Sequence, residues 1–158
     1  MSATTPECAG LKKSGRDFAV IVNRGPIDSC ANVFTSNRAI ANPIIWSKEV
    51  AKTGKARAVA INSGGANCFT GPQGFQLTHK TAEHTAKLLE IAPIEVLVAS
   101  TGLIGQQLDE SKIVAGIEKC IETLSESGGY DAAEAIMTTD SVHKHAIRDG
   151  EGFSIGGI

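Results

Sequence analysis

The most constraining feature of this sequence is a short apolar segment that ends in two hydroxyl residues and a glycine. Residues 94–100 follow a proline, read Ile-Glu-Val-Leu-Val-Ala-Ser and are rich in β-branched side chains, which predicts a buried strand. Thr101 and Gly102 come next, so a hydroxyl and a closely approachable backbone N–H meet where this strand ends. Two such donors can hold a developing oxyanion. An ordinary turn after a strand is the alternative, and spacing alone favours it.

The composition indicates a single globular domain of a soluble protein. The chain has 158 residues, of which 42% are hydrophobic and 20% are charged. Its formal net charge of -2 argues against a general affinity for nucleic acid or for an acidic membrane surface. No apolar run approaches the length of a membrane span, and the first residues lack the pattern of a signal peptide. We therefore expect a cytoplasmic protein that binds neither nucleic acid nor membrane.

The cysteines and histidines do not form a metal-binding pattern. The cysteines are Cys8, Cys30, Cys68 and Cys120. None belongs to a Cys-x-x-Cys pair, so we expect reduced, mostly buried thiols rather than a zinc site, with a disulfide framework as the less favoured alternative. His79 and His84 are five residues apart and do not share a helix face, so both are expected at the surface or its boundary. His143 and His145 share one side of an extended segment, where solvent exposure is the simpler interpretation.

The hydrophobic patterns predict a mixture of strands and helices after an irregular start over residues 1–16. Apolar runs bounded by turn residues predict strands over residues 17–23, 31–35, 43–46, 56–62, 94–100 and 153–158. Helical spacing and capping residues predict helices over residues 47–52, 74–90, 109–125 and 131–137.

These elements predict an α/β fold, a layered sandwich with mixed β-sheets and flanking helices. Residues 56–62 and 94–100 are apolar along nearly their whole length, as strands covered on both faces must be, so both are expected to be central. The helix between them makes this region a βαβ unit. Residues 17–23 and 31–35 are separated by a short turn, which suggests an antiparallel pair.

Two polar segments are candidates for ligand binding. Residues 63–72 are rich in glycine, asparagine and serine, and their backbone N–H groups suit an anion ahead of a helix. A tight strand-to-helix crossover explains the same segment equally well. Thr138, Thr139 and Asp140 follow a predicted helix, where capping is the common role and contact with a substrate amide or carboxylate is the functional alternative.

Several ordered motifs resemble those of one enzyme family. They are Asn-Ser-Gly-Gly-Ala-Asn at residues 62–67, Thr-Gly-Pro-Gln-Gly at 70–74, the segment 95–105, Ala-Ile-Met-Thr-Thr-Asp at 135–140, Gly-Leu-Lys-Lys-Ser-Gly at 10–15 and Asn-Val-Phe-Thr-Ser-Asn at 32–37. In order and spacing they resemble the ornithine acetyltransferases, which are glutamate N-acetyltransferases of the cyclic arginine pathway. The resemblance covers nearly the whole chain.

The resemblance implies a two-chain enzyme. In that family a precursor cuts itself before a threonine, and the α and β fragments remain together, typically as two of each. The new N-terminal threonine of β takes an acetyl group from N-acetylornithine and passes it to glutamate, and some members also use acetyl-CoA. Residues 1–158 would then be a single α-subunit-like domain without metal or resident cofactor. Thr101 and Gly102 would form the oxyanion hole, and Thr138 would contact substrate.

The sequence departs from the family pattern in two places, and two other functions stay open. The glycine-alanine segment before Gly10 is compressed, and neither the Ala-Lys-Gly segment nor the cleavage-site threonine that the family would place after residues 156–158 is present. One alternative is a fragment of a self-processing N-terminal-nucleophile aminopeptidase with the same general architecture. The other is a truncated, non-catalytic binding or structural subunit.

Overall fold

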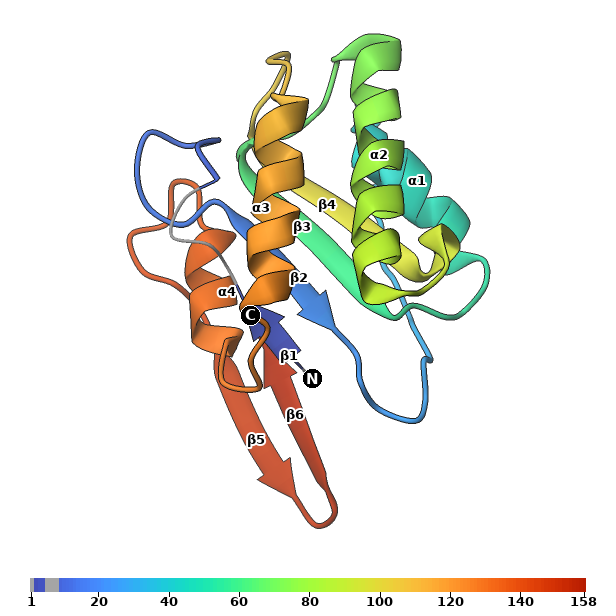
Figure 1. Ribbon diagram of the computed structural model, residues 1–158, viewed down its shortest axis with the longest axis vertical. Helices are drawn as coiled ribbons and strands as arrows, with labels where there is room; N and C mark the ends of the chain where they lie inside the picture. The colour runs from blue at the N-terminus through green and yellow to red at the C-terminus, as the bar shows by residue number, and fades with distance from the viewer. Residues whose placement is uncertain (1, 5–8) are drawn as a thin grey trace.

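The fold is built on a four-stranded mixed sheet, shown in Figure 1. The computed structural model describes residues 2–4 and 9–158. The strands are β1 (Ser2–Thr4), β2 (Phe18–Val22), β3 (Ala58–Gly65) and β4 (Val96–Leu103), and they lie in this order across the sheet. The pairs β1–β2 and β2–β3 are antiparallel, whereas β3 and β4 are parallel. The prediction of an α/β fold with mixed strands and flanking helices is confirmed.

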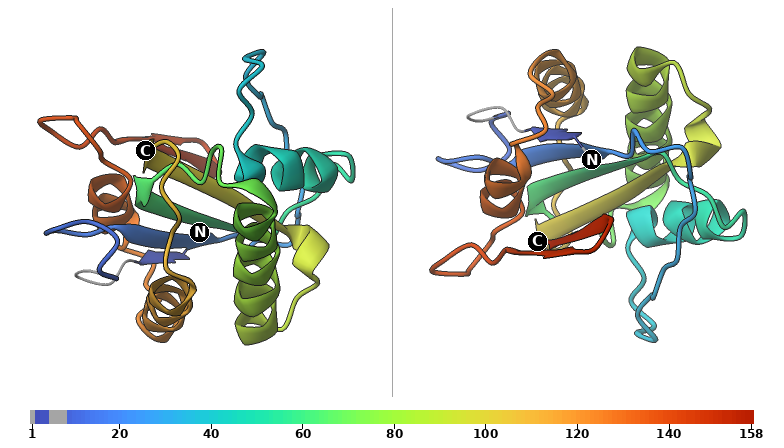
Figure 2. Two further views of the ribbon diagram at one scale, coloured as in Figure 1. Left: turned by 90° about the horizontal axis from the view of Figure 1, so that it is seen from above. Right: turned by 90° about the horizontal axis from the view of Figure 1, so that it is seen from below.

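Helices lie on both sides of this sheet. They are α1 (Asn42–Ala51), α2 (Gly71–Leu89), the 3₁₀ turn η1 (Pro93–Glu95), α3 (Glu110–Glu122) and α4 (Gly129–Ala135). Figure 2 shows α2 and α3 together on one side, with α1 and α4 toward the other. The predicted helices over 74–90, 109–125 and 131–137 correspond to α2, α3 and α4. None of the helices in the described part of the chain is long and apolar enough to cross a membrane.

The main core lies between the sheet and the pair α2 and α3. Alternate residues of β2, β3 and β4 point to this side, including the buried Phe18, Ala60 and Val98. Ile113 and Ile117 of α3 pack against them from a stripe with helical spacing. A small second core on the other side joins Ala19 of β2 to alanines of α4. Strand alternation therefore decides which side chains of β3 and β4 face each layer.

A hairpin at the C-terminal end projects beyond the sheet. It consists of β5 (Ala146–Gly150) and β6 (Phe153–Gly157), an antiparallel pair whose ten residues are all exposed. Phe153 and Ile155 share one face of the hairpin and are each at least 60% exposed. Figures 1 and 2 show it extending from the side of the sheet away from α2 and α3. The predicted strand over 153–158 is thus present, but it has no place in the main sheet.

Two predicted strands near the N-terminal half are wrong. Residues 43–46 are not a strand followed by a separate helix, because Pro43 lies in the first turn of one continuous helix, α1. Proline suits that position, since its fixed φ fits a helix and its missing N–H would have no helical partner there. Residues 31–35 form no strand, and Val33 is fully exposed. Their predicted pairing partner, β2, pairs with β1 and β3 instead.

The positions of the other strands also need correction. Residues 1–16 were expected to be irregular, yet Ser2–Thr4 forms β1; Met1 and residues 5–8, among them Cys8, lie outside the described residues. Residues 94–100 were expected to form a central strand, but residues 93–95 form η1 and β4 lies at an edge of the described sheet. β3 is central, as predicted. β4 is apolar because helices cover both of its faces, and not because it has a second neighbouring strand.

The core assignment can be tested by shortening one side chain of α3. Ile117 is fully buried, so Ile117→Ala removes methyl and methylene groups from a packed interior and leaves a cavity. We expect a loss of about 2–5 kcal/mol in the free energy of unfolding, measured by urea denaturation. Ile27, which is 69% exposed, supplies the control, because Ile27→Ala should change stability by less than about 0.5 kcal/mol. Equal effects of the two substitutions would contradict the assignment.

Candidate active site

The parallel strands β3 and β4 end in a direct contact between backbones. Gly64 and Gly102 are register partners, and both have positive φ, at 112° and 125°. A Cβ added at Gly102 would lie 2.7 Å from the carbonyl carbon of Gly64 and 2.7 Å from the nitrogen of Gly65. No other residue type fits that space without moving the backbone. The close approach of a ligand or a second chain to Gly102 stays a prediction, and the backbone that contacts Gly102 in the structure is that of β3.

The N-terminal loop continues this contact on the other side of Gly64. A Cβ at Gly64 would lie 2.7 Å from the carbonyl oxygen of Leu11. The loop is held by the buried carboxylate of Asp17, which accepts hydrogen bonds from the backbone N–H groups of Ala9, Leu11 and Lys12 at 2.6, 2.7 and 3.0 Å. Three backbone segments thus stack at the ends of the parallel strands without intervening side chains.

Helix α1 covers only part of the open edge of β4. Trp46 donates from Nε1 to the carbonyl oxygen of Val96 at 2.8 Å, and Ser47 donates from Oγ to that of Val98 at 2.7 Å. These contacts show that the even-numbered residues of β4 direct their backbone groups away from β3. The Leu103 carbonyl accepts from Ala66 on the β3 side, as the alternation requires. The same alternation directs the N–H of Gly102, an exposed residue, to the edge that α1 leaves uncovered.

The Thr101 side chain belongs to the α4 side of the sheet. Thr101 is half-buried and pairs in register with Ser63. The Ser63 hydroxyl donates to the carbonyl oxygen of Ala135, the last residue of α4. Lys12 donates from Nζ to the carbonyl oxygen of Met137 at 3.1 Å. These two bonds fix the segment that leads into Thr138 at the same end and on the same side of the sheet as Thr101.

The Thr-Thr-Asp motif follows α4, as predicted, although the helix ends two residues earlier than expected. α4 ends at Ala135, and Thr138 and Thr139 are exposed on the bend that follows. Asp140 is paired with Lys144, whose hydrogen bond and charge hold the pKa of the Asp140 carboxyl below its usual range. The Asp140 carboxylate is therefore bonded to a residue of its own turn, whereas Thr138 and Thr139 are exposed. Of the motif, Thr138 and Thr139 are the residues available to a ligand.

The glycine-rich segment after β3 fills its interior with its own hydrogen bonds. The Asn67 side chain accepts from Thr70 Oγ1 at 2.6 Å and donates to the Gly74 carbonyl at 2.8 Å and to Thr78 Oγ1 at 3.0 Å. Asn42 Nδ2 also donates to Thr70 Oγ1, at 2.9 Å. These bonds favour the strand-to-helix crossover over the anion site. The helix predicted over residues 74–90 begins slightly earlier than expected, because α2 starts at Gly71.

The histidines take part in side-chain packing. His79 packs edge-on against Trp46, and His84 lies 3.2 Å from Glu118. His143 and His145 stack on each other, and the Tyr130 ring packs against them at a tilt. His145 is exposed as expected, whereas His143 is half-buried. Within residues 9–158, no three histidine, cysteine or acidic side chains gather closely enough to hold a metal ion.

The described cysteines are free thiols. Cys68 and Cys120 are buried, and Cys30 is half-buried. Burial raises the pKa of the Cys120 thiol to about 12, which keeps it protonated and unreactive at neutral pH. The prediction of reduced, mostly buried thiols holds for these three residues.

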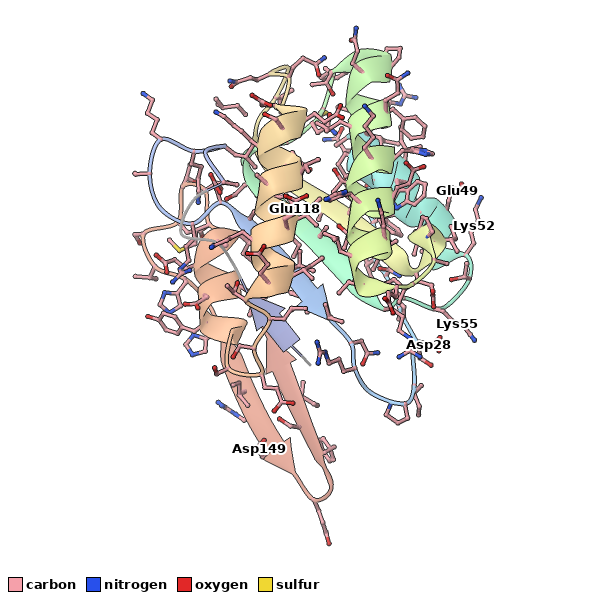
Figure 3. The ribbon with its side chains drawn as sticks, in the orientation of Figure 1. Asp28, Glu49, Lys52, Lys55, Glu118 and Asp149 are labelled. Atoms are coloured by element: carbon pink, nitrogen blue, oxygen red, sulfur yellow. The ribbon has the colours of Figure 1, made fainter. Side chains whose placement is uncertain are left out.

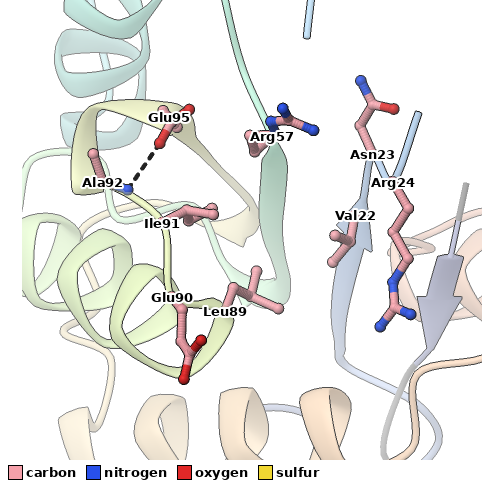
Figure 4. Close-up of a pocket in the computed structure, with 9 residues that line it drawn as sticks. All are labelled: Val22, Asn23, Arg24, Arg57, Leu89, Glu90, Ile91, Ala92 and Glu95. Carbon is pink, nitrogen blue, oxygen red and sulfur yellow. Dashed lines mark hydrogen bonds between the residues drawn. The ribbon is translucent and has the colours of Figure 1, made fainter. Parts of the chain in front are cut away.

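A pocket of about 640 Å³ lies at the opposite ends of the strands from Thr101 and Gly102. Arg24, Arg57, Glu90 and Glu95 surround its apolar floor (Figure 4). The ion pairs Lys52–Glu49 and Lys55–Asp28 lie toward the same side of the molecule, where Figure 3 labels them. Arg24 and Arg57 precede β3, and Glu90 and Glu95 lie between α2 and β4. The pocket is therefore separate from the strand-end site.

Sequence reasoning missed the residues that hold the strand ends together. Asp17, Asn62 and Ser63 were counted only as parts of a strand or a motif. Each has a buried polar side chain. A polar residue inside an otherwise apolar strand was the available signal, because a buried polar group must find a partner.

The fold and these strand ends define a class of α/β protein whose candidate site presents hydroxyls and backbone groups at the termini of parallel strands. The profile of the ArgJ family matches residues 3–158, and the chain belongs to the ArgJ family. It is 52% identical over 150 residues to "Arginine biosynthesis bifunctional protein ArgJ 1" of Streptomyces clavuligerus. That match covers 94% of this chain and 39% of the relative, so the chain spans about two fifths of the relative's length.

Two solved structures share the fold. The ornithine acetyltransferase of Mycobacterium tuberculosis, crystallised with ornithine, matches with a TM-score of 0.94 and 44% identity, over 99% of this chain and 85% of that chain. The arginine biosynthesis bifunctional protein ArgJ of Bacillus halodurans matches with a TM-score of 0.87 and 34% identity, over 99% of this chain and 83% of that chain. The family resemblance inferred from the sequence motifs is therefore confirmed.

The glycine contact predicts a specific loss of stability. Gly102→Ala places a Cβ against the backbone of β3 at a φ that L-residues rarely adopt, so it should lower the free energy of unfolding by at least about 1–3 kcal/mol. Gly129→Ala is the matched control, because a Cβ there meets nothing within 4 Å and the residue begins a helix. Thermal and urea unfolding should separate the two variants. If Gly102→Ala were as stable as Gly129→Ala, the close contact would be disproved.

Proposed function

We propose that this chain is the α-chain portion of an acetyltransferase that moves an acetyl group from N-acetylornithine to glutamate in arginine biosynthesis. Its role is to supply the oxyanion hole, through Thr101 and Gly102, and part of the substrate site, through Thr138. The observation that carries the proposal is the end of β4, where Thr101 and the exposed Gly102 are consecutive residues at the part of the edge that α1 leaves uncovered. The names of the ArgJ relatives and the ornithine in the M. tuberculosis crystal support the substrate class.

The proposed reaction proceeds through an acetylated threonine on a β chain. The threonine Oγ attacks the acetyl carbonyl of N-acetylornithine while its proton passes to the α-amino group of the same threonine. The carbonyl electron pair moves onto oxygen, and the resulting oxyanion accepts hydrogen bonds from Thr101 and Gly102. Collapse expels ornithine, whose amine takes the proton. The glutamate amine then attacks the acetyl-threonine ester and gives a proton to the threonine α-amino group, and the same donors stabilise the second tetrahedral intermediate. Its collapse breaks the bond to threonine Oγ, which takes the proton back, and releases N-acetylglutamate.

The partner of this chain is proposed to be a β subunit that carries the N-terminal threonine, in an α2β2 assembly. The segment spans only 39% of the S. clavuligerus protein but 85% of the M. tuberculosis chain in the crystal, which is what a family divided into two chains would give. The hairpin β5–β6 supports the proposal of a partner chain, because its Phe153 and Ile155 side chains are exposed. An exposed apolar hairpin and an uncovered strand edge are surfaces that folded proteins normally cover.

The reaction needs no metal or resident cofactor, and acetyl-CoA is an alternative acetyl donor. An enzyme of amino-acid biosynthesis with reduced thiols fits the cytoplasm. No described residue is assigned to coenzyme binding.

The isolated 158-residue chain is expected to be catalytically silent. An oxyanion hole lowers the barrier for an attack but supplies no nucleophile, so acetyl transfer should require the β chain. Incubating the purified chain with N-acetylornithine and glutamate, with and without a separately produced β chain, measures this by N-acetylglutamate formation. Transfer by the chain alone would overturn the proposed division of roles.

The two assigned threonines should affect different kinetic constants in the complete protein. Thr101→Ala removes a donor that meets only the oxyanion, so kcat should fall by about 10²–10³ while KM changes little. Self-cleavage passes through similar chemistry, so uncut precursor should accumulate on a denaturing gel. Thr138→Ala should instead raise KM and leave processing normal. Assays with N-acetylornithine and glutamate give both constants.

Thr53→Ala is the control for these variants, because Thr53 is an exposed threonine just after α1 and outside the candidate site. A Thr101→Ala protein that matures and turns over at the wild-type rate would remove the oxyanion assignment. A short peptide amide tested beside N-acetylornithine distinguishes acetyl transfer from aminopeptidase activity. Hydrolysis of the peptide without acetyl transfer would replace the proposed function.

A further inference from the structure

Asn62 is a buried polar residue that links the two strands at the candidate site. It lies in β3, is only 4% exposed and pairs in register with Ser100 of β4. Ser100 Oγ donates to Asn62 Oδ1 at 2.5 Å, and Asn62 Nδ2 donates to the carbonyl oxygen of Gly65 at 3.0 Å. One amide therefore satisfies a hydroxyl of β4 and a carbonyl at the end of β3, and only one orientation of the amide permits both bonds.

The residues that Asn62 contacts adjoin the proposed oxyanion donors. Ser100 immediately precedes Thr101, and the backbone of Gly65 faces the position of a Cβ on Gly102 at 2.7 Å. A shift of Ser100 moves the strand that carries Thr101, and a shift of Gly65 moves the surface against which Gly102 rests. The Asn62 side chain therefore controls both neighbours of the donor pair from inside the sheet.

We propose that Asn62 is a positioning residue for the oxyanion donors. It fixes the separation of the β3 and β4 ends and thereby aims the Thr101 hydroxyl and the Gly102 N–H at one point. This inference rests on the proposed function, because it assigns the reason for the geometry to acyl transfer. Its action is indirect: Asn62 lies on the α2 and α3 side of the sheet, whereas the Thr101 side chain lies on the α4 side.

An oxyanion hole tolerates only small displacements of its donors. Donors stabilise the tetrahedral intermediate only when they lie within hydrogen-bond distance of the oxygen in that state. A misplacement of about 1 Å can reduce a rate about 10²-fold. Substrate binding does not use the oxyanion position, so loosening the strand ends should affect kcat much more than KM.

The test uses two substitutions in the complete protein that break different bonds of the same amide. Asn62→Asp keeps an acceptor for Ser100 but replaces the donor to Gly65 with a carboxylate oxygen. Ser100→Ala removes the hydroxyl that Asn62 accepts from. Each should lower kcat for acetyl transfer by about tenfold or more with KM within about twofold. Ser100→Thr, which retains the hydroxyl, should restore a kcat near that of the wild type.

A double-mutant cycle with Thr101→Ala separates positioning from general destabilisation. If Ser100 and Asn62 act through the donor pair, adding Ser100→Ala to Thr101→Ala should cost much less in kcat than it does alone. Independent effects on kcat would multiply and would contradict the inference. If Asn62→Asp fails to fold, the Ser100 variants and this cycle still decide.

Ser47→Ala is the matched control for the loss of a buried hydrogen bond to the same strand. Ser47 bonds both the N–H and the carbonyl of Val98, so its loss should lower thermal stability but leave kcat unchanged. If Ser100→Ala behaves like Ser47→Ala, with lower stability and normal kcat, Asn62 has only a structural role. Loss of the positioning effect would leave the proposed function intact. A Thr101→Ala protein with the wild-type rate would remove the oxyanion assignment itself, and with it this inference.

Discussion

The arrangement of the site depends on the close approach of three backbone segments. Gly102 rests against Gly64 and Gly65, and Gly64 rests against Leu11, with no Cβ between them. Because β3 and β4 are parallel and paired through this region, the contact brings N–H and carbonyl groups from distant parts of the chain to one edge. The loop that contains Leu11 is fixed in turn by the carboxylate of Asp17. Without the glycine contact, the strand ends would separate and these groups would lose their common orientation.

The edge of β4 has a covered part and an uncovered part, and the candidate donors lie in the uncovered part. Trp46 and Ser47 bond to the outward-facing carbonyl groups of Val96 and Val98. An additional strand therefore cannot pair with this stretch of β4. Beyond it, Gly102 presents an unprotected edge. The uncovered end of such a strand is a surface on which another chain can pack. In the proposed enzyme, that chain brings the threonine nucleophile to the open half.

Sequence patterns predicted the long regular elements well because their signals are local. The stripe containing Ile113 and Ile117 and the apolar run of β3 specify their own structure. The errors arose where partners far along the chain decide the outcome. Pro43 begins a helix whose Trp46 bonds the edge of β4, fifty residues later, and no local pattern reveals this. β4 looked central for the same reason, because an edge covered by helix α1 needs apolar residues too.

The candidate site was only partly visible in the sequence. Thr101 and Gly102 stood out because a hydroxyl and a glycine followed a strand, and the motif resemblance added Thr138. Asn62 belonged to one of the recognised motifs, yet its proposed role depends on a hydrogen bond from Ser100, 38 residues away. Sequence order gives no measure of such a pairing, whereas the parallel register places the two residues side by side.

The distribution of roles in the proposed reaction follows from which groups this segment organises by itself. The glycine contact and the Asn62 bonds lie entirely within the described residues, so the proposed oxyanion donors can be aligned without the proposed β chain. Preorganised donors cost no rearrangement when negative charge develops, which is the main source of their catalytic effect. A nucleophile that carries its own α-amino base needs only to be placed next to them. In the proposed two-chain enzyme, the rigid electrostatic site of this chain is therefore separate from the reacting group, which the β chain carries.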